Sequence, residues 1–246
     1  MKKILYLCVF SLLLAGCSNK SSVFGDKRVA HIHVHYNDST MSETNIGYDN
    51  ENRLSTFTNT NTRGSRTYSF TIDSVRYDVD SMTMYDNANK RIFEYVIKQG
   101  LAINCYVTSP DEGNYTASFH YINGHLFAIH ETRSLSFSNT PDTIIRITYD
   151  EKGNITSFKN KYLSTSITPS SDKNKDNLML APVNLDTYAP AFYAGILGLA
   201  PKQKTEAYTD SSDLKTSFSY SEADKTATIT TTNTAGEKTT FSYDFK

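Results

Sequence analysis

A complete strand, turn and strand near the middle of the chain constrains the fold more than any other feature. Residues 143–149 alternate between apolar and polar side chains, which is the two-residue period of a half-buried β-strand. Asp150 can bond its own backbone in a tight turn, and Gly153 can adopt the positive φ that restarts the ladder. Residues 154–158 form the second apolar run, so the segment predicts a β-hairpin.

Looser copies of this unit recur along the chain. Where the central copy has Gly153, the first copy has Asn52, which is the next-best residue for the left-handed region. Asn123-Gly124 is a tighter version, because both residues tolerate the positive φ of a type I′ turn. The tyrosines that precede the turns are unevenly spaced, which indicates a meander of unequal hairpins and not a solenoid repeat. These tyrosines are Tyr48, Tyr85, Tyr121, Tyr149 and Tyr220.

The predicted fold class is therefore all-β and mainly antiparallel. We expect a curved hairpin meander or a partly open barrel, with one short helical segment near residues 186–199. Asp186 or Thr187 would cap that helix and Pro201 would stop it. Its apolar face would consist of four side chains at helical spacing, Tyr188, Phe192, Ile196 and Leu199.

Two further features bear on this fold. Residues 164–178 are rich in Ser, Thr, Asn, Asp and Lys around Pro169, a composition that predicts a mobile loop. A membrane-spanning barrel needs an apolar lipid-facing side, whereas residues 226–232 alternate apolar side chains with threonine. One face of the sheet is therefore expected to meet water.

The N-terminus predicts a secreted and lipidated protein. A basic start, an apolar run over residues 4–14 and small residues after it form a secretory signal peptide, residues 1–16. Residues 14–17, Leu-Ala-Gly-Cys, resemble the lipobox of bacterial lipoproteins, which implies lipid attachment at Cys17. Ser18-Asn19 lacks the Asp that marks inner-membrane retention, which favours the outer membrane and leaves the leaflet open. Residues 17–27 then form a flexible tether to the membrane, and residues 28–246 form a single antiparallel β domain.

The charge balance argues against a nucleic-acid partner, and the cysteine count argues against an internal disulfide. The chain has a formal net charge of −1, and loss of Lys2 and Lys3 with the signal lowers it to −3. No nucleic-acid partner is expected, because no basic stripe is present to neutralise phosphates. Cys8 leaves with the signal and Cys17 carries the lipid, so Cys105 is expected as a small buried apolar residue. The sequence does not define the oligomeric state.

The turn units resemble those of a known family of proteins. Together with Asn184-Leu-Asp and with the stretch Phe192-Tyr-Ala-Gly-Ile-Leu-Gly198, they are similar to a family of YD-repeat-like lipoproteins of unknown function from Gram-negative gut anaerobes. The resemblance extends over most of residues 29–246. It implies a fold described as porin-like and a place in the cell envelope, and it carries no site residues.

The sequence contains no signature of catalysis or of a bound cofactor. Nucleophile-elbow, P-loop, dinucleotide-binding and zincin motifs are all missing. His31, His33 and His35 share a strand face and two of them could share an ion, but no acidic or cysteine partner is placed with them. A polar, solvent-facing strand is favoured over a metal site. We therefore expect no catalytic residue, no metal, no cofactor and no enzymatic activity.

Two functions follow as hypotheses. The first is an outer-membrane-anchored lipoprotein that binds an apolar or amphipathic ligand, a lipid or a glycan fragment, on a concave, aromatic-rich sheet. The alternative is a structural or adhesive envelope module that contacts other proteins through its sheet edges. The candidate ligand contacts form the densest apolar cluster after the signal, which could be a core plug or a movable lid. They are Tyr188, Phe192, Tyr193, Ile196 and Leu197.

Overall fold

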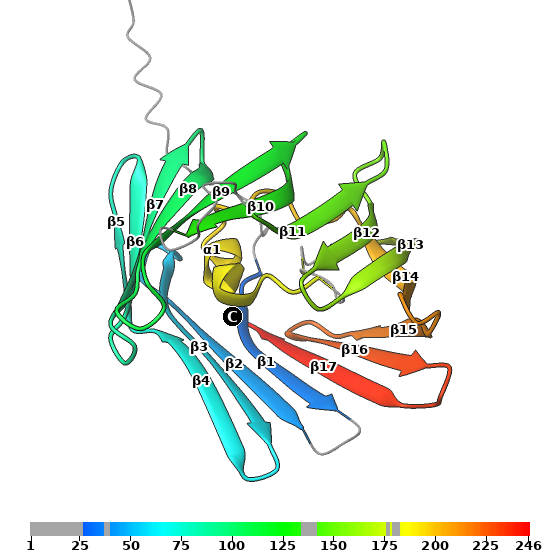
Figure 1. Ribbon diagram of the computed structural model, residues 1–246. Coiled ribbons are helices and arrows are strands. Elements are labelled where there is room, and N and C mark those ends of the chain that lie inside the picture. The colour runs from blue at the N-terminus through cyan, green and yellow to red at the C-terminus, as the bar shows by residue number, and fades with distance from the viewer. Residues whose placement is uncertain (1–26, 37–39, 134–141, 176–177, 179–182) are drawn as a thin grey trace, which may run out of the picture.

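The computed structural model of the protein describes residues 27–36, 40–133, 142–175, 178 and 183–246 (Figure 1). The predicted signal peptide, Cys17 and nearly all of the tether lie outside the described residues. No described helix has the length and apolar content to cross a membrane.

Seventeen strands and one short helix make up the described chain. The first nine strands are β1 Val29–Tyr36, β2 Met41–Tyr48, β3 Leu54–Arg63, β4 Arg66–Ile72, β5 Ser74–Tyr77, β6 Ser81–Asp86, β7 Arg91–Lys98, β8 Leu101–Thr108 and β9 Tyr115–Ile122. The later elements are β10 His125–Arg133, β11 Asp142–Tyr149, β12 Ile155–Asn160, β13 Ser164–Lys173, a 3-10 turn Asp186–Tyr188, α1 Ala189–Tyr193, β14 Gln203–Asp210, β15 Lys215–Glu222, β16 Thr226–Asn233 and β17 Lys238–Phe245.

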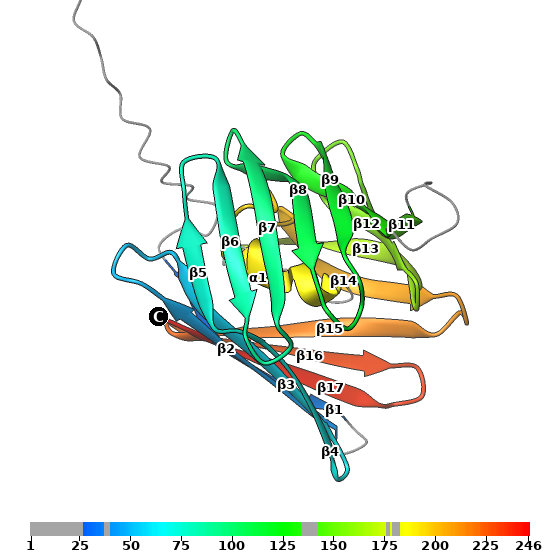
Figure 2. The ribbon, with the colours of Figure 1, turned by 60° about the vertical axis from the view of Figure 1, so that its left-hand side comes forward.

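The strands form a nearly closed antiparallel barrel, which confirms the predicted fold class. Neighbours in the chain pair with each other around the ring, and β17 pairs with β1 to close it. β4 and β5 are two segments of one bent strand, joined by Asp73; β4 pairs with β3 and β5 with β6. Figures 1 and 2 both place α1 inside the ring of strands. We call the two ends of the barrel the Val29 end, where β1 begins, and the Tyr36 end, where β1 finishes.

Alternation along the strands divides the interior from the exterior. On β15, Thr216 is buried and Phe218 is half-buried, whereas Ser217 and Ser219 are exposed. The same pattern gives β1 its buried Ile32 and Val34. The outward positions of these strands carry polar side chains, where a membrane-spanning barrel carries apolar ones.

The repeated turns have the geometry that their sequence predicts. Gly153 has a φ of +84°, and its N–H donates to the Asp150 carbonyl at 3.1 Å. One carboxylate oxygen of Asp150 accepts from the backbone N–H of Lys152 at 2.9 Å and of Asn154 at 2.8 Å. The hydrogen bond from the Asn154 backbone is the main cause that lowers the pKa of Asp150. Asp49 builds the same turn, with Asn52 at a φ of 58°.

Tyrosines near the ends of strands tie neighbouring strands together, and four of them, Tyr48, Tyr121, Tyr149 and Tyr220, belong to the repeated unit, whereas Tyr77 does not. A tyrosine near the end of one strand donates its hydroxyl to a backbone carbonyl near the start of an earlier strand. Tyr149, for example, donates to the Leu126 carbonyl at 2.9 Å. Burial raises the pKa of the Tyr149 hydroxyl, so the group stays protonated and can donate. Among the described residues, five such bonds lie at the Val29 end, and their donors and acceptors are Tyr48 and Val29, Tyr77 and Leu54, Tyr121 and Ala102, Tyr149 and Leu126, and Tyr220 and Thr205.

Removing one of these hydroxyls should weaken the barrel measurably. Tyr149→Phe is expected to lower the free energy of unfolding by about 1–2 kcal/mol, because it removes the hydroxyl partner of the Leu126 carbonyl. Tyr162→Phe is the matched control, since Tyr162 is 80% exposed and should change stability by less than about 0.5 kcal/mol. Urea denaturation of both variants measures the difference, and equal midpoints would contradict a stabilising role for this hydroxyl.

The predicted helix is shorter than expected. It covers only Ala189–Tyr193, after a 3-10 turn, and its N-cap is Tyr188 without a side-chain cap bond. The prediction of Asp186 or Thr187 as N-cap is therefore wrong. The helix stops early because Gly195 has a φ of +81°, a left-handed residue that terminates an α-helix.

Most of the predicted mobile loop is a strand. β13 occupies Ser164–Lys173, with Thr165 and Ile167 buried, and it pairs with β12 and β14. The low apolar content of this strand concealed its two-residue period. Pro169 is tolerated because the register shifts on both sides of it, which is where a strand accommodates proline.

Candidate functional site

The interior of the barrel is filled at one end and hollow at the other. The segment from residue 183 to 201, which includes α1, packs against the strands towards the Val29 end. Towards the Tyr36 end the strands surround a cavity of about 610 Å³. This volume lies within the range of small-molecule sites in proteins. We call it the lumen cavity.

Most of the predicted ligand contacts belong to the filled part. Tyr188, Phe192 and Leu197 are each 1% exposed and Ile196 is 7% exposed, so these side chains pack in the core. The Tyr188 hydroxyl donates to Glu131 Oε1 at 2.7 Å. Tyr193 differs from them, because it is half-buried and lines the lumen cavity. Leu199, expected on the same helical face, is 44% exposed on the outside.

Aromatic side chains form a large part of the cavity lining. The Tyr193 ring stacks on Phe57 with centroids 6.1 Å apart. Phe70 on β4 lies beside Phe57 with centroids 6.0 Å apart. Rings on β1, β14 and β17 complete the set, namely Tyr36, Tyr208 and Phe241. They present flat apolar surfaces to whatever occupies the space.

Polar side chains on β2 and β3 form a connected strip in the same cavity. Asn59 Nδ2 donates to Ser42 Oγ at 3.1 Å and to Thr44 Oγ1 at 2.9 Å. Asn61 Nδ2 donates to Asn59 Oδ1 at 2.7 Å. These bonds hold the amides and hydroxyls in place, while the remaining lone pairs and protons of the group stay available to a ligand.

The described part of this lining is uncharged. Among the described residues that line the lumen cavity, none is Asp, Glu, Lys, Arg or His. A smaller cavity of about 250 Å³ continues from it and shares Tyr36, Tyr208, Thr231 and Thr239. This smaller cavity has two charged residues in its described lining, Glu237 and Lys238 near the β16–β17 turn. The larger space therefore suits an uncharged ligand with apolar faces and hydrogen-bonding edges.

The other residues singled out by the sequence lie apart from the cavity. His31, His33 and His35 are exposed on the outer face of β1, and His31 Nδ1 lies 2.7 Å from Asn45 Oδ1. The described part of the chain holds no group of three or more His, Cys, Asp or Glu side chains suited to a metal ion. Cys105 is buried as expected, and burial raises the pKa of its thiol, which disfavours the thiolate.

Sequence reasoning missed the polar strip and most of the aromatic lining. A usable signal was present on β3, where the inward face changes from Phe57 to Asn59 and Asn61 within one strand. Such a change from apolar to polar on a single face marks a wet section of an otherwise dry interior. The aromatic side chains on distant strands could not be grouped, since only the closed ring brings them together.

The fold is similar to that of solved structures whose sequences are only distantly similar. No protein-family model and no curated protein matches the chain. A porin-like protein from Bacteroides uniformis ATCC 8492 is similar in structure, with a TM-score of 0.67 and 17% identity over 89% of this chain and 96% of that one. A porin-like protein from Bacteroides vulgatus ATCC 8482 is similar with a TM-score of 0.56 and 12% identity, over 90% and 99% of the two chains. The expected porin-like fold is confirmed, and at this identity the likeness extends to the fold alone.

Proposed function

We propose that the protein is a lipid-anchored, non-enzymatic binding protein of the outer membrane that holds an uncharged amphipathic ligand in the lumen cavity. Of the two ligand classes expected from the sequence, a glycan fragment fits this lining better than a lipid. A sugar ring offers an apolar face for stacking and a rim of hydroxyl groups, whereas an acyl chain has nothing to bond the amides.

The observation that carries this proposal is the pairing of aromatic rings with a fixed polar strip. Phe57, Phe70 and Tyr193 supply the stacking surfaces. Asn59 and Asn61 supply donors and acceptors that are already oriented by hydrogen bonds to each other and to β2. A lining of this kind recognises a neutral polyhydroxylated compound without a large cost of ordering its own side chains.

The structural or adhesive alternative has less support. It needs an open sheet edge, and pairing of β17 with β1 removes the edge that the chain ends would leave. A cavity of about 610 Å³ is also more than a purely structural module requires. We therefore favour ligand binding over a structural or adhesive role.

Isothermal titration with neutral trisaccharides of different linkage and with dodecan-1-ol tests the proposal. We expect at least one trisaccharide to bind, and Asn59→Ala and Phe70→Leu each to raise its Kd about tenfold, an energy of roughly 1.4 kcal/mol. Leucine keeps the apolarity of position 70 and removes the flat ring, so it separates stacking from simple burial. Tyr162→Ala, on the exposed surface, is the control and should leave the Kd unchanged.

Two outcomes would contradict this proposal. Binding of dodecan-1-ol that is insensitive to both variants, with no binding of trisaccharides, would assign the cavity to a lipid. Absence of binding by every compound in the series, from protein whose folding is confirmed by circular dichroism, would remove the cavity as a glycan site.

The lipid anchor has its own test. Cys17→Ala should leave an unprocessed precursor that no longer incorporates labelled palmitate, because the thiol that carries the lipid is gone. Gel mobility and palmitate labelling of the parent and variant measure this. A variant that still matures and fractionates with the outer membrane would show that the anchor is elsewhere.

A further inference from the structure

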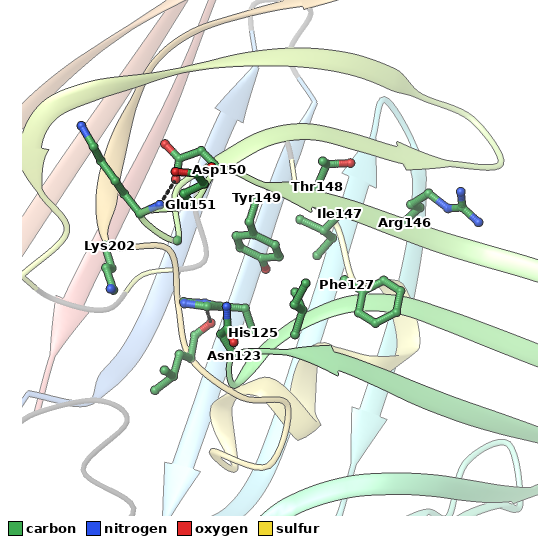
Figure 3. A pocket seen from close by; sticks show the side chains of 14 residues that line it. Asn123, His125, Phe127, Arg146, Ile147, Thr148, Tyr149, Asp150, Glu151 and Lys202 are labelled. Carbon is green, nitrogen blue, oxygen red and sulfur yellow. Dashed lines mark hydrogen bonds between the residues drawn. The ribbon is translucent and has the colours of Figure 1, made fainter.

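A crevice opens in the barrel wall where two neighbouring strands separate. The ladder between β10 and β11 ends at the pair Ala128 and Arg146, after a register shift further along β10. Beyond this pair, at the Val29 end, the gap is spanned by the Tyr149 hydroxyl on the Leu126 carbonyl. The resulting crevice has a volume of about 490 Å³ and is separate from the lumen cavity (Figure 3).

The segment after α1 runs past the β9–β10 and β11–β12 turns and forms one side of the crevice, and its Lys202 N–H donates to the Gly153 carbonyl at 3.5 Å. The Leu199 N–H donates to the Gly124 carbonyl at 2.9 Å, and the Leu199 carbonyl lies 3.1 Å from His125 Nδ1. His125 must therefore donate from Nδ1, which leaves the lone pair on Nε2. These contacts fix the position of the segment between two hairpin turns, so the shape of the crevice is set by the fold.

The walls of the crevice are unusually apolar for an outer surface. Among the described residues eight large apolar side chains are exposed, and three of them line this crevice: Ile122, Phe127 and Leu199. Ile147 and Tyr149 continue the same surface inwards. Clustering of exposed apolar side chains around one hollow marks a binding surface more than isolated exposure does.

Lysine side chains collect at one end of the crevice, whereas Arg146 lies at the opposite end. Figure 3 shows Phe127 and Arg146 towards one end and Lys202 towards the other. Lys152 and Lys202 also line an adjoining cavity of about 440 Å³. Lys173 and Lys175 also line that second cavity, which therefore carries four lysines and no carboxylate among its described lining residues.

The lysines near this end outnumber the acidic groups. Asp150 and Glu151 line the crevice with Lys152 and Lys202, and Lys173 and Lys175 line the adjoining cavity. The Asp150 carboxylate also accepts hydrogen bonds from the backbone of its own turn. The Asn154 side chain donates to its second oxygen at 2.9 Å. The lysines form no ion pair with the described residues, so their charge is available to a ligand.

We propose that this crevice binds a small amphiphile with an apolar chain and an anionic head group. The chain lies on Phe127, Ile147 and Leu199, and the head lies between Lys152 and Lys202. Charge complementarity selects an anion over a neutral amphiphile, and the apolar walls select an amphiphile over a bare anion. This ligand differs in class from the neutral compound proposed for the lumen cavity. Failure of one proposal would therefore not contradict the other.

Titration calorimetry with octanoate, octyl phosphate and octan-1-ol tests the proposal and separates carboxylate from phosphate head groups. The parent protein should bind at least one of the two anions about tenfold more tightly than octan-1-ol. The double variant Lys152→Gln and Lys202→Gln should lose this preference while keeping the affinity for octan-1-ol. Phe127→Ala should weaken all three compounds about fivefold or more.

Matched controls keep the test specific. Lys98→Gln removes an exposed lysine on β7, away from the crevice, and Met41→Ala removes an exposed apolar side chain on β2; both should bind octanoate like the parent. Asn59→Ala, in the lumen cavity, should also leave octanoate binding unchanged. Equal affinity for octanoate and octan-1-ol, or an anion preference that survives the double lysine variant, would overturn the proposal.

Discussion

Replacement of Phe192 by alanine is expected to lower the free energy of unfolding by about 3–5 kcal/mol, the cost of deleting a buried aromatic ring from a packed core. Phe192 is 1% exposed and packs edge-on against Tyr193, with centroids 5.4 Å apart. The surrounding barrel cannot collapse onto the space that the ring leaves, because its strands are fixed by closure of the ring. Chemical denaturation measured by circular dichroism gives the difference directly.

Leu199→Ala is the informative control. The sequence assigned Phe192 and Leu199 to one helical face, whereas Leu199 is 44% exposed on the outer wall. Its replacement should cost less than about 1 kcal/mol. If Phe192→Ala instead left stability nearly intact and changed trisaccharide binding in the lumen cavity, the segment would be a lid and not a plug.

The second large effect is expected at Gly198. It has a φ of +86°, and a Cβ placed there would lie 2.4 Å from the Gly124 carbonyl oxygen, a backbone atom that cannot turn aside. Gly198→Ala should therefore cost about 2–5 kcal/mol, from the left-handed backbone and from displacement of the neighbouring turn. The urea midpoint of the variant measures this.

Gly236→Ala measures how much of the stability loss comes from the left-handed backbone conformation alone. Gly236 has nearly the same φ, +83°, and a Cβ added there would meet no atom within 4 Å beyond its own chain neighbours. Only the left-handed conformation is then penalised, by about 1–2 kcal/mol. Equal losses at both glycines would show that the contact between residues 198 and 124 carries no energetic weight.

Local features of this fold were predictable from the sequence. Asp150 and Gly153 specify a turn through bonds that span five residues, so the hairpin could be predicted without knowledge of the remaining chain. The positive φ of Asn123 and Gly124 follows in the same way. The strands on either side were predictable where apolar side chains alternate with polar ones.

Features that depend on distant contacts were not predictable. β13 contains few apolar residues and is a strand because β12 and β14 supply its hydrogen bonds. The inward orientation of Asn59 becomes a site only when β14 and β17 bring Tyr208 and Phe241 to the same cavity. The helix ended early because Gly195 adopts a left-handed conformation, which helical spacing alone does not reveal.

Because successive strands run in opposite directions, one end of the barrel lies near the start of the domain and the other end lies far from it. β1 starts at Val29, beside the end of β17, where the Lys246 N–H donates to the Arg28 carbonyl at 2.8 Å. The lumen cavity reaches the opposite end, near Tyr36 and the β16–β17 turn, about 25 Å away along a strand of eight residues. If Cys17 holds the lipid, the tether joins the barrel at the Val29 end, which is also the end that holds the crevice beside Leu199. The lumen cavity then opens at the end of the barrel that is farthest from the point of attachment.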